Sequence, residues 1–350
     1  MPLLDAVIEK VTGLDAKKLV LVPLIVLLLA VGVLVYSQLA FGTPVKLGMD
    51  FTGGTLVRIT TPETKDELLA KFSEFPNVII REAGDEKILQ FGPMSAAEKE
   101  RLIQLITSYP DYEIKDVSPL FGKEAQVQTI KALVIAFLLM AVVIFIVFRT
   151  PVPAAAIVFC AASDIVIAAA CMDIVHLELS LGTVAALLML IGYSVDSNIL
   201  LTTKLLRSSP VSGSKKSDML KVLERLKAAM RTGLTMTSTT LSAVFAMFVV
   251  AACMSSLSEY YAPIPLLRDI SIVLIFGLLA DLMNTWMFNA GVLRFYLGEA
   301  RAAEMKQRAG TMVKKAKKSK TKAAETGEVA KARKTEKGVK TQKGGERRGR

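Results

Sequence analysis

Six long apolar stretches dominate the hydrophobic pattern of the chain. They cover residues 19–41, 132–148, 152–175, 180–203, 232–254 and 269–293. A transmembrane helix needs about 20 mostly apolar residues, whereas helices of a soluble core are rarely so long and so apolar. The first stretch is too long for the apolar region of an ordinary signal peptide, and no clean small-x-small cleavage site follows it. The pattern therefore predicts a polytopic α-helical membrane protein with six transmembrane helices.

Residues 42–131, between the first two stretches, follow a different pattern. Apolar residues alternate at Leu47, Met49 and Phe51 and then recur at helical spacing further along. The predicted elements are a strand running through 47–60, a helix over 64–75, a hairpin over 78–91, a helix after the capping residue at 95 and a strand over 112–117. This β-α-β-β-α-β order is typical of a ferredoxin-like α+β domain.

Gly53 and Gly54 interrupt the first predicted strand. Glycine inside a strand indicates either a β-bulge or the close approach of another backbone. A phosphate-binding loop does not fit, because no Lys-Ser or Lys-Thr pair follows and no helix is expected directly after the glycines. We expect the glycine pair to have a structural role, most simply as a bulge.

Loop charges predict the orientation of the six helices. Lys and Arg gather in residues 1–18, in the connection at Arg149, in the loop 204–231 and in the tail 299–350. The other short connections are poor in basic residues, and Arg268 is the exception among them. Cytoplasmic loops of membrane proteins carry an excess of Lys and Arg. Both termini are therefore expected in the cytoplasm of a multi-pass cell-membrane protein, with the 42–131 domain outside and residues 132–298 holding the last five helices.

The two largest basic segments on that side have different patterns. Within the loop 204–231, apolar residues recur on one face of a helix that ends near Met230, which predicts an amphipathic cytoplasmic helix at the interface or on a partner. The tail 299–350 has almost no aromatic residues and is expected to be disordered. Its expected contact is with anionic lipids, worth about 1 kcal/mol per basic residue near the surface, and a ribosome contact is the alternative.

Composition narrows the function classes. The net charge of +11 comes from the tail, where residues 299–350 carry +12 and residues 1–298 carry −1, so the body is not a nucleic-acid-binding domain. Cys160, Cys171 and Cys253 all lie in apolar runs, which excludes a disulfide scaffold, and a single His argues against a His-ligated metal site. We see no nucleophile-base constellation and no nucleotide-binding loop. The chain is therefore expected to have no catalytic residues, no metal and no cofactor, and not to be an enzyme.

Three carboxylates lie deep in the predicted spans. Asp164 is near the middle of the third stretch, Asp196 is in the fourth, and Asp281 is in the sixth, where Asn284 and Asn289 follow. An ionised carboxylate at mid-bilayer costs about 2.5–3.5 kcal/mol on insertion scales and marks a functional site by default. These residues are therefore proton-relay candidates. The alternative is that they only form hydrogen bonds to neighbouring helices.

Arg231, at the start of the fifth stretch, is the intramolecular cation in this pattern. A nearby Arg favours the charged form of a carboxylate, and burial favours the neutral form, so a balance between them allows proton binding and release. Arg231 is a fourth proton-relay candidate, and an interfacial anchor is its alternative role.

Three motifs resemble signatures of the SecF members of the SecD/SecF protein-export family. The matching residues are Gly48, Asp50, Phe51, Gly53 and Gly54 after the first stretch, residues 116–124 before the second, and Gly192, Tyr193, Ser194 and Asp196 in the fourth. Phe51 stands where SecD members usually have Leu. In bacterial members the Asp of the fourth stretch stands one position later, where this chain has Ser197. The motif sequence of this chain is therefore more similar to that of archaeal members.

The resemblance implies half of an RND-type transporter fold, pairing with a SecD-like subunit, and association with the Sec translocon channel and exported polypeptides. It implies use of the proton gradient, with Asp196 and Arg231 in the family's carboxylate and basic positions. The one-residue offset turns Asp196 about 100° away from the bacterial position on an ideal helix. Two alternatives stay open: a self-contained proton-driven small-solute exporter, and a non-energised scaffold that presents the outer domain to emerging chains.

Overall fold

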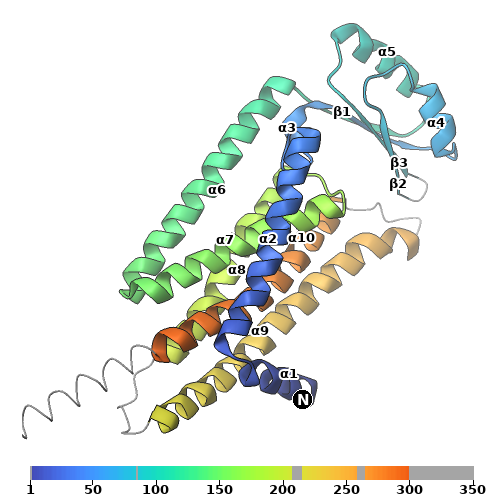
Figure 1. Ribbon diagram of the computed structural model, residues 1–350. Coiled ribbons are helices and arrows are strands. Elements are labelled where there is room, and N and C mark those ends of the chain that lie inside the picture. The colour runs from blue at the N-terminus through green and yellow to red at the C-terminus, as the bar shows by residue number, and fades with distance from the viewer. Residues whose placement is uncertain (1, 84–85, 207–214, 258–264, 299–350) are drawn as a thin grey trace, which may run out of the picture. The chain divides into compact units, whose positions relative to one another are not determined.

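The computed structural model describes residues 2–83, 86–206, 215–257 and 265–298 (Figure 1). By its internal contacts the chain divides into two units, Met1–Pro210 with Leu220–Phe295, and Val211–Met219 with Tyr296–Arg350. The tail expected to be disordered, 299–350, lies outside the described residues, as does part of the predicted turn at 83–85.

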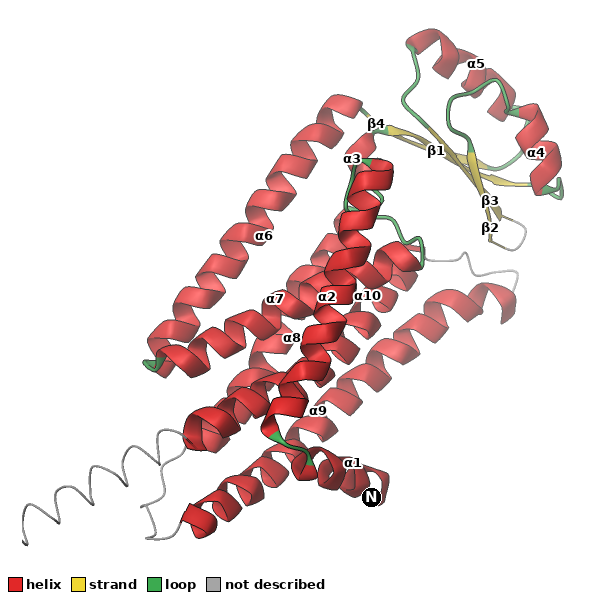
Figure 2. Cartoon of the chain, in the orientation of Figure 1, coloured by secondary structure: helices red, strands yellow, loops and turns green. Residues whose placement is uncertain are grey.

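Long helices make up most of the described chain (Figure 2). They are α1 Pro2–Gly13, α2 Ala16–Phe41, α6 Pro119–Phe148, α7 Pro151–Ile174, α8 Leu181–Leu206, α9 Lys215–Leu257 and α10 Pro265–Met283. Five of them are long and apolar enough to cross a membrane: α2, α6, α7, α8 and the Leu220–Ala252 part of α9. The prediction of a polytopic helical membrane protein is thereby confirmed. Five of the six predicted spans match these candidate membrane helices.

The sixth predicted stretch has an irregular helix. The 19-residue helix α10 passes at Met283 into a π-helix, η1 Asn284–Asn289, and the chain stays helical to residue 298. This helix is not among the five candidate spans of the described residues. A sixth span therefore stays a prediction.

Two predicted helices are longer in the structure than in the sequence pattern. Helix α6 begins at Pro119. Proline suits the first position of a helix, because the N–H of that residue would form no hydrogen bond within the helix. Helix α9 joins the predicted amphipathic segment and the fifth span into one continuous helix. Leu226 and Met230 on its apolar face are fully buried. Helix α1, within the predicted cytoplasmic N-terminus, was not expected.

The segment between α2 and α6 contains a four-stranded antiparallel sheet. Its elements are β1 Gly54–Thr60, α4 Lys65–Lys71, β2 Ile79–Ala83, β3 Glu86–Phe91, α5 Ala96–Ile106 and β4 Tyr112–Val117, and the sheet order is β2-β3-β1-β4. The β-α-β-β-α-β order is the predicted one. Capping boxes at Thr64 and Ser95 start the two helices.

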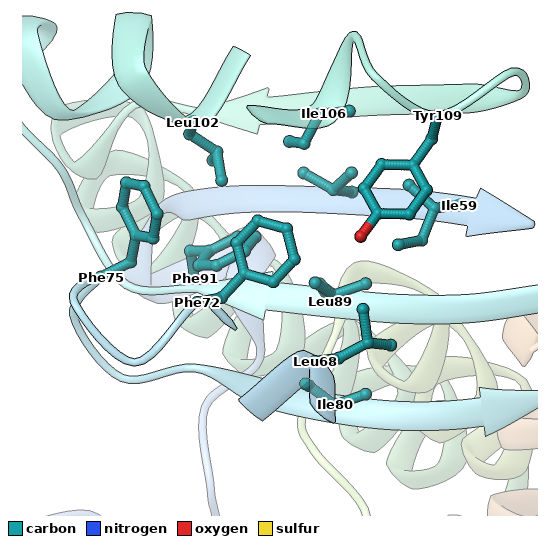
Figure 3. Close-up of a cluster of buried hydrophobic side chains, with 11 residues drawn as sticks. Ile59, Leu68, Phe72, Phe75, Ile80, Leu89, Phe91, Leu102, Ile106 and Tyr109 are labelled. Atoms are coloured by element: carbon teal, nitrogen blue, oxygen red, sulfur yellow. The ribbon is translucent and has the colours of Figure 1, made fainter. Parts of the chain in front are cut away.

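The core of this outer domain is apolar. Leu68 of α4 and Leu102 of α5 are at most 1% exposed, and they pack against the sheet together with a group of phenylalanines. Figure 3 shows Phe72, Phe75 and Phe91 close together. Their ring centroids are 5.7–6.2 Å apart. Burial of such rings supplies most of the stabilisation in a small domain.

The predicted strand through Leu47, Met49 and Phe51 is wrong. Residues Met49–Thr52 form the short helix α3, and strand β1 begins only at Gly54. The glycine pair makes the turn between them, at φ of +76° for Gly53 and +135° for Gly54, a backbone region that side chains with a Cβ rarely adopt. The expected bulge is absent from the described strand β1, and the alternative, close backbone approach, is confirmed: a Cβ on Gly54 would collide with the carbonyl oxygen of Phe91.

Candidate functional site

A cluster of polar side chains is buried where α7, α8, α10 and η1 pack together. Each member is at most 3% exposed, although the helices that carry them are strongly apolar. The members are Ser163 and Asp164 of α7, Ser194, Asn198 and Thr202 of α8, Asp281 of α10, and Asn284, Thr285 and Asn289 of η1. We refer to these nine residues as the polar cluster. Buried polar groups of this kind need hydrogen-bond partners or a function.

Asp164 joins three helices. Its Oδ2 accepts a hydrogen bond from Ser194 Oγ at 2.5 Å, and its Oδ1 accepts one from Asn284 Nδ2 at 2.6 Å. The same Asn284 amide also donates to Ser163 Oγ at 2.9 Å. Both carboxylate oxygens of Asp164 are therefore satisfied by neutral donors.

Asp281 is satisfied on one side only. Its Oδ1 accepts a hydrogen bond from Thr285 Oγ1 at 2.9 Å, whereas its Oδ2 is buried without a hydrogen-bond partner. Within the described residues, no ion pair joins Asp164 or Asp281 to a cation. A buried polar atom without a partner is costly. Asp281 Oδ2 is therefore the least satisfied carboxylate oxygen of the polar cluster.

The cluster continues along α8 in steps of one helical turn. Ser194, Asn198 and Thr202 are four residues apart, so they lie on one face of the helix. Asn198 Nδ2 donates to the Ser194 carbonyl oxygen at 2.8 Å, and Asn289 Nδ2 donates to Asn198 Oδ1 at 2.7 Å. The polar path thus extends about 12 Å along α8 from the level of Ser194.

The π-helix η1 determines which side chains reach the cluster. In an α-helix, residues five apart point about 140° away from each other. The i→i+5 pattern of a π-helix brings them back to one face. Asn284 therefore contacts Asp164 while Asn289 contacts Asn198. Trp286 of η1 packs so closely on Gly233 of α9 that a Cβ at that glycine would collide with the ring.

The structure brings some of the predicted proton-relay candidates together and not others. Asp164 and Asp281 are both in the polar cluster, and Ser194, which belongs to the fourth-stretch motif, joins them. Asp196 is two residues beyond Ser194, about 200° around the helix, and is exposed. Arg231 is exposed and forms an ion pair with Asp5 of α1, with Nη2 2.8 Å from Oδ1.

The remaining motif residues lie in two places. Gly192 and Tyr193 are exposed on α8, and a Cβ added at Gly192 would meet open space. Gly48, Asp50 and Phe51 lie at the start of α3, where the outer domain meets the connection between α7 and α8. The fourth-stretch and GG motifs therefore do not form one site.

Four residues of the polar cluster were not among the candidates that the sequence pattern indicated. They are Ser163, Asn198, Thr202 and Thr285. The four-residue period of polar residues from Ser194 to Thr202 was a usable signal for the face of α8. No comparable signal indicated the residues of η1, because a search for α-helical spacing assumes 3.6 residues per turn and does not detect a π-helix. Among the described residues, no group of three or more His, Cys, Asp and Glu side chains could hold a metal ion.

Two family profiles match the chain. One, described as protein export membrane protein SecD/SecF, C-terminal, matches residues 98–299, and the other, described as SecD/SecF GG motif, matches residues 39–61. The first covers the polar cluster and the second covers α3.

Curated relatives from archaea carry the name protein-export membrane protein SecF. The relative from Methanolacinia petrolearia is 44% identical over 81% of this chain and 94% of its own length. The relative from Pyrococcus furiosus is 38% identical over 87% of this chain and 100% of its own length.

The fold is similar to that of solved SecDF structures. A crystal structure described as SecDF, a translocon-associated membrane protein, from Thermus thermophilus superposes with a TM-score of 0.61 at 22% identity. A second structure, SecDF in a super-membrane-facing form, gives a TM-score of 0.53 at 20% identity. These matches cover 80% and 83% of this chain but only 38% and 39% of the solved chains, so this chain spans about two fifths of their length.

Proposed function

Because the chain belongs to the SecF proteins of the SecD/SecF protein-export family, we propose that it pairs with a SecD-like subunit and uses the proton gradient to promote translocation of exported polypeptides. The chain is a multi-pass cell-membrane protein and an accessory subunit of Sec protein export. We propose three further properties: the chain pairs with a SecD-like subunit, it uses the proton gradient, and it associates with the Sec translocon channel.

In the proposed arrangement, the 265–298 helix is the sixth span, both termini are cytoplasmic, and the outer domain is extracytoplasmic. The asymmetry of Lys and Arg between the loops supports this orientation. The element order and the sheet order β2-β3-β1-β4 support assigning the outer domain to the ferredoxin-like class. The basic tail, 299–350, then faces the anionic lipids of the cytoplasmic leaflet.

Two observations support a SecD-like partner. The matched region is less than half of each solved SecDF chain. The rest of those chains is long enough to contain a counterpart of the proposed SecD-like subunit. The exposed carboxylate of Asp196 lies on a helix apolar enough to span the membrane, beside Tyr193. A carboxylate facing lipid is costly, so a partner that covers this face of α8 removes the cost. The pair would form a twelve-span assembly similar to RND-type transporters.

The observation that carries the proton proposal is a pair of buried carboxylates that form no ion pair with any Lys or Arg in the described part of the chain. Asp164 and Asp281 lie in one cluster, and one oxygen of Asp281 accepts no hydrogen bond from the described residues. A proton on Asp164 turns an acceptor of the Ser194 hydroxyl into a donor, so the contacts between α7 and α8 change with proton binding. Proton uptake and helix packing are therefore linked in the proposed mechanism.

The scaffold hypothesis has one observation in its favour. Both oxygens of Asp164 are satisfied inside the subunit, which is also what a purely structural hydrogen-bond network between helices requires. The small-solute exporter loses support, because the relatives that match most of the chain are protein-export proteins.

The test is export with and without an imposed pH gradient, in vesicles that contain the chain, its SecD-like partner and the translocon. We expect the gradient to stimulate export for the parent chain and not for Asp164→Asn or Asp281→Asn, because an amide keeps most hydrogen bonds but carries no exchangeable acid proton. Asp66→Asn, on the exposed side of the outer domain, is the matched control.

Two outcomes would change this conclusion. If both cluster variants keep the gradient stimulation while deletion of 42–131 abolishes export, the scaffold hypothesis is correct. If only Asp196→Asn removes the stimulation, the proton passes through the face of α8 that the partner covers rather than through the polar cluster.

A further inference from the structure

We propose that Asp50 is a positioning residue that couples the outer domain to the polar cluster through helix α8. The proposal rests on the proposed function only in taking Asp164 as the residue that changes state. It assigns a role to the Gly48-to-Gly54 motif, whose residues lie outside the polar cluster.

The chain just before Asp50 pairs with the connection between α7 and α8. The Leu179 N–H donates to the Lys46 carbonyl oxygen at 2.7 Å, and the Gly48 N–H donates to the Leu179 carbonyl oxygen at 2.8 Å. Leu47 and Leu179 form a parallel bridge between these bonds. A Cβ at Gly48 would lie 2.8 Å from the Leu179 oxygen, so only glycine allows this approach. The pairing brings the motif next to the first residue of α8.

The carboxylate of Asp50 contacts two elements at once. Its Oδ2 accepts a hydrogen bond from the Leu181 N–H, at the start of α8, at 3.2 Å. Its Oδ1 lies 3.4 Å from Lys115 Nζ on strand β4. An anionic side chain at a helix N-terminus satisfies a free N–H and interacts favourably with the helix dipole. Asp50 therefore links the last strand of the outer domain to the start of α8.

Phe51 fixes the same point to α6. Its ring is 1% exposed and packs with Ala125 of α6 and Val184 of α8. Its carbonyl oxygen accepts a hydrogen bond from Gln126 Nε2 at 2.7 Å. A Cβ at Gly122 would lie 2.6 Å from that oxygen, so α6 and α3 are in close contact. Asp50 is thus held in a firmly packed turn rather than in a free loop, which a positioning role requires.

Helix α8 connects this turn to the polar cluster. Ser194 lies 13 residues beyond Leu181, about 20 Å along the helix axis, and donates to Asp164 Oδ2. Asp50 therefore contacts the first residue of α8, and Asp164 contacts the middle of the same helix. When Asp164 changes between acceptor and donor, any displacement of α8 acts on the Asp50 contacts. By linkage, a change at the outer domain acts on Asp164 to the same extent.

The experiment is backbone hydrogen exchange of the full-length chain in lipid nanodiscs. We expect Asp164→Asn to change the exchange rate of amides in β4 and at Leu181 by about fivefold or more, the lower range of measured couplings between sites. We expect Asp50→Ala to abolish this response. Asp50→Asn keeps a cap for Leu181 but loses the charge attraction to Lys115, so it should leave a response at Leu181 and remove the one in β4. This variant also covers the case in which Asp50→Ala does not fold.

Asp66→Ala, in the same domain and away from α8, is the control and should leave the response unchanged. The proposal is overturned if Asp164→Asn changes β4 equally in the presence and absence of the Asp50 carboxylate, or does not change β4 at all. Because the readout contains no export step, its result is independent of the export assay. A coupled response without gradient-stimulated export would refute the proposed function and leave this inference intact.

Discussion

The outer domain and the membrane helices have opposite distributions of polar residues. In the outer domain Phe72 is fully buried and the charged pairs lie at the surface. In the helices, apolar side chains such as Leu29 and Leu139 are more than 60% exposed, while Asp164 at the centre is 0% exposed. One chain thus follows two rules. Water favours apolar interiors, whereas lipid favours an apolar exterior and leaves the interior available for polar groups.

The carboxylates of the two regions also have different partners. The pKa of Asp116 in the outer domain is lowered, because the Lys99 ammonium and the Thr55 hydroxyl outweigh the raising effect of burial, which is the largest single influence. The pKa of Glu63 is lowered mainly by the hydrogen bond from Tyr109 and further by Lys71, against burial. Among the described residues, the side chains that donate hydrogen bonds to the carboxylates of the polar cluster are hydroxyls and an amide. Asp116 and Glu63 are therefore held as charged groups, and the nine residues of the polar cluster include no Lys or Arg that would do the same.

The largest effect is expected from the apolar core of the outer domain. Phe72→Ala should destabilise that domain by about 3–5 kcal/mol, because a cavity replaces a fully buried ring. The measurement is the opening free energy from hydrogen exchange over 54–117 in the full-length chain. Ile103→Ala, at a position that is 46% exposed on α5, should stay within about 0.5 kcal/mol. Equal losses for the two variants would contradict an apolar core as the source of stability.

A smaller effect is expected at the polar centre of the helices. Asp164→Ala should destabilise the helix bundle by about 1–3 kcal/mol, because it leaves the donors of Ser194 and Asn284 without their acceptor. Thermal unfolding in detergent measures the loss. Asp196→Ala makes the same chemical change at an exposed position of α8 and should not destabilise the bundle, because it removes a carboxylate that is costly in an apolar surrounding. If the ranking is reversed, the buried cluster does not contribute to packing of the helices.

The smallest effect is expected at the surface ion pair of Lys99 and Asp116. Because the folded pKa of Asp116 is lowered, its contribution is present above the unfolded pKa and is lost as the pH falls through the folded value. Lys99→Ala should therefore cost about 0.2–1 kcal/mol near neutral pH and almost nothing once Asp116 is protonated. Outer-domain stability from pH 7 down to pH 2 measures this. A loss that persists undiminished at the acidic end would show that Lys99 acts through packing and not through charge.

Local patterns predicted most of the elements. The apolar stretches matched helices because length and hydrophobicity along the chain decide whether a segment can span lipid, and the outer domain followed its alternating and helical periods. The failure at Met49 and Phe51 has a local cause: three alternating apolar residues also fit a four-residue helix whose neighbours cover it on several sides. The short pattern could not distinguish the two.

The sequence predicted some residues of the candidate site but not which of them are in contact. That Asp164 and Asp281 belong to a polar site followed from the cost of carboxylates in lipid. The sequence pattern did not predict that Asp196 and Arg231 lie outside the polar cluster. It also did not predict that Asn284 contacts Asp164. These outcomes depend on how α8 is rotated and on the π-turn of η1.

The sequence by itself determined which segments are helices in an apolar setting, which segment forms the separate α+β domain, and where most of the charge lies, because each of these depends on residues close together in the chain. Only the tertiary structure decided which polar groups meet. Asp164 contacts residues 30 and 120 positions away, and Asp50 contacts one 131 positions away. Contacts over such separations depend on the packing of whole helices against one another, which no local periodicity encodes.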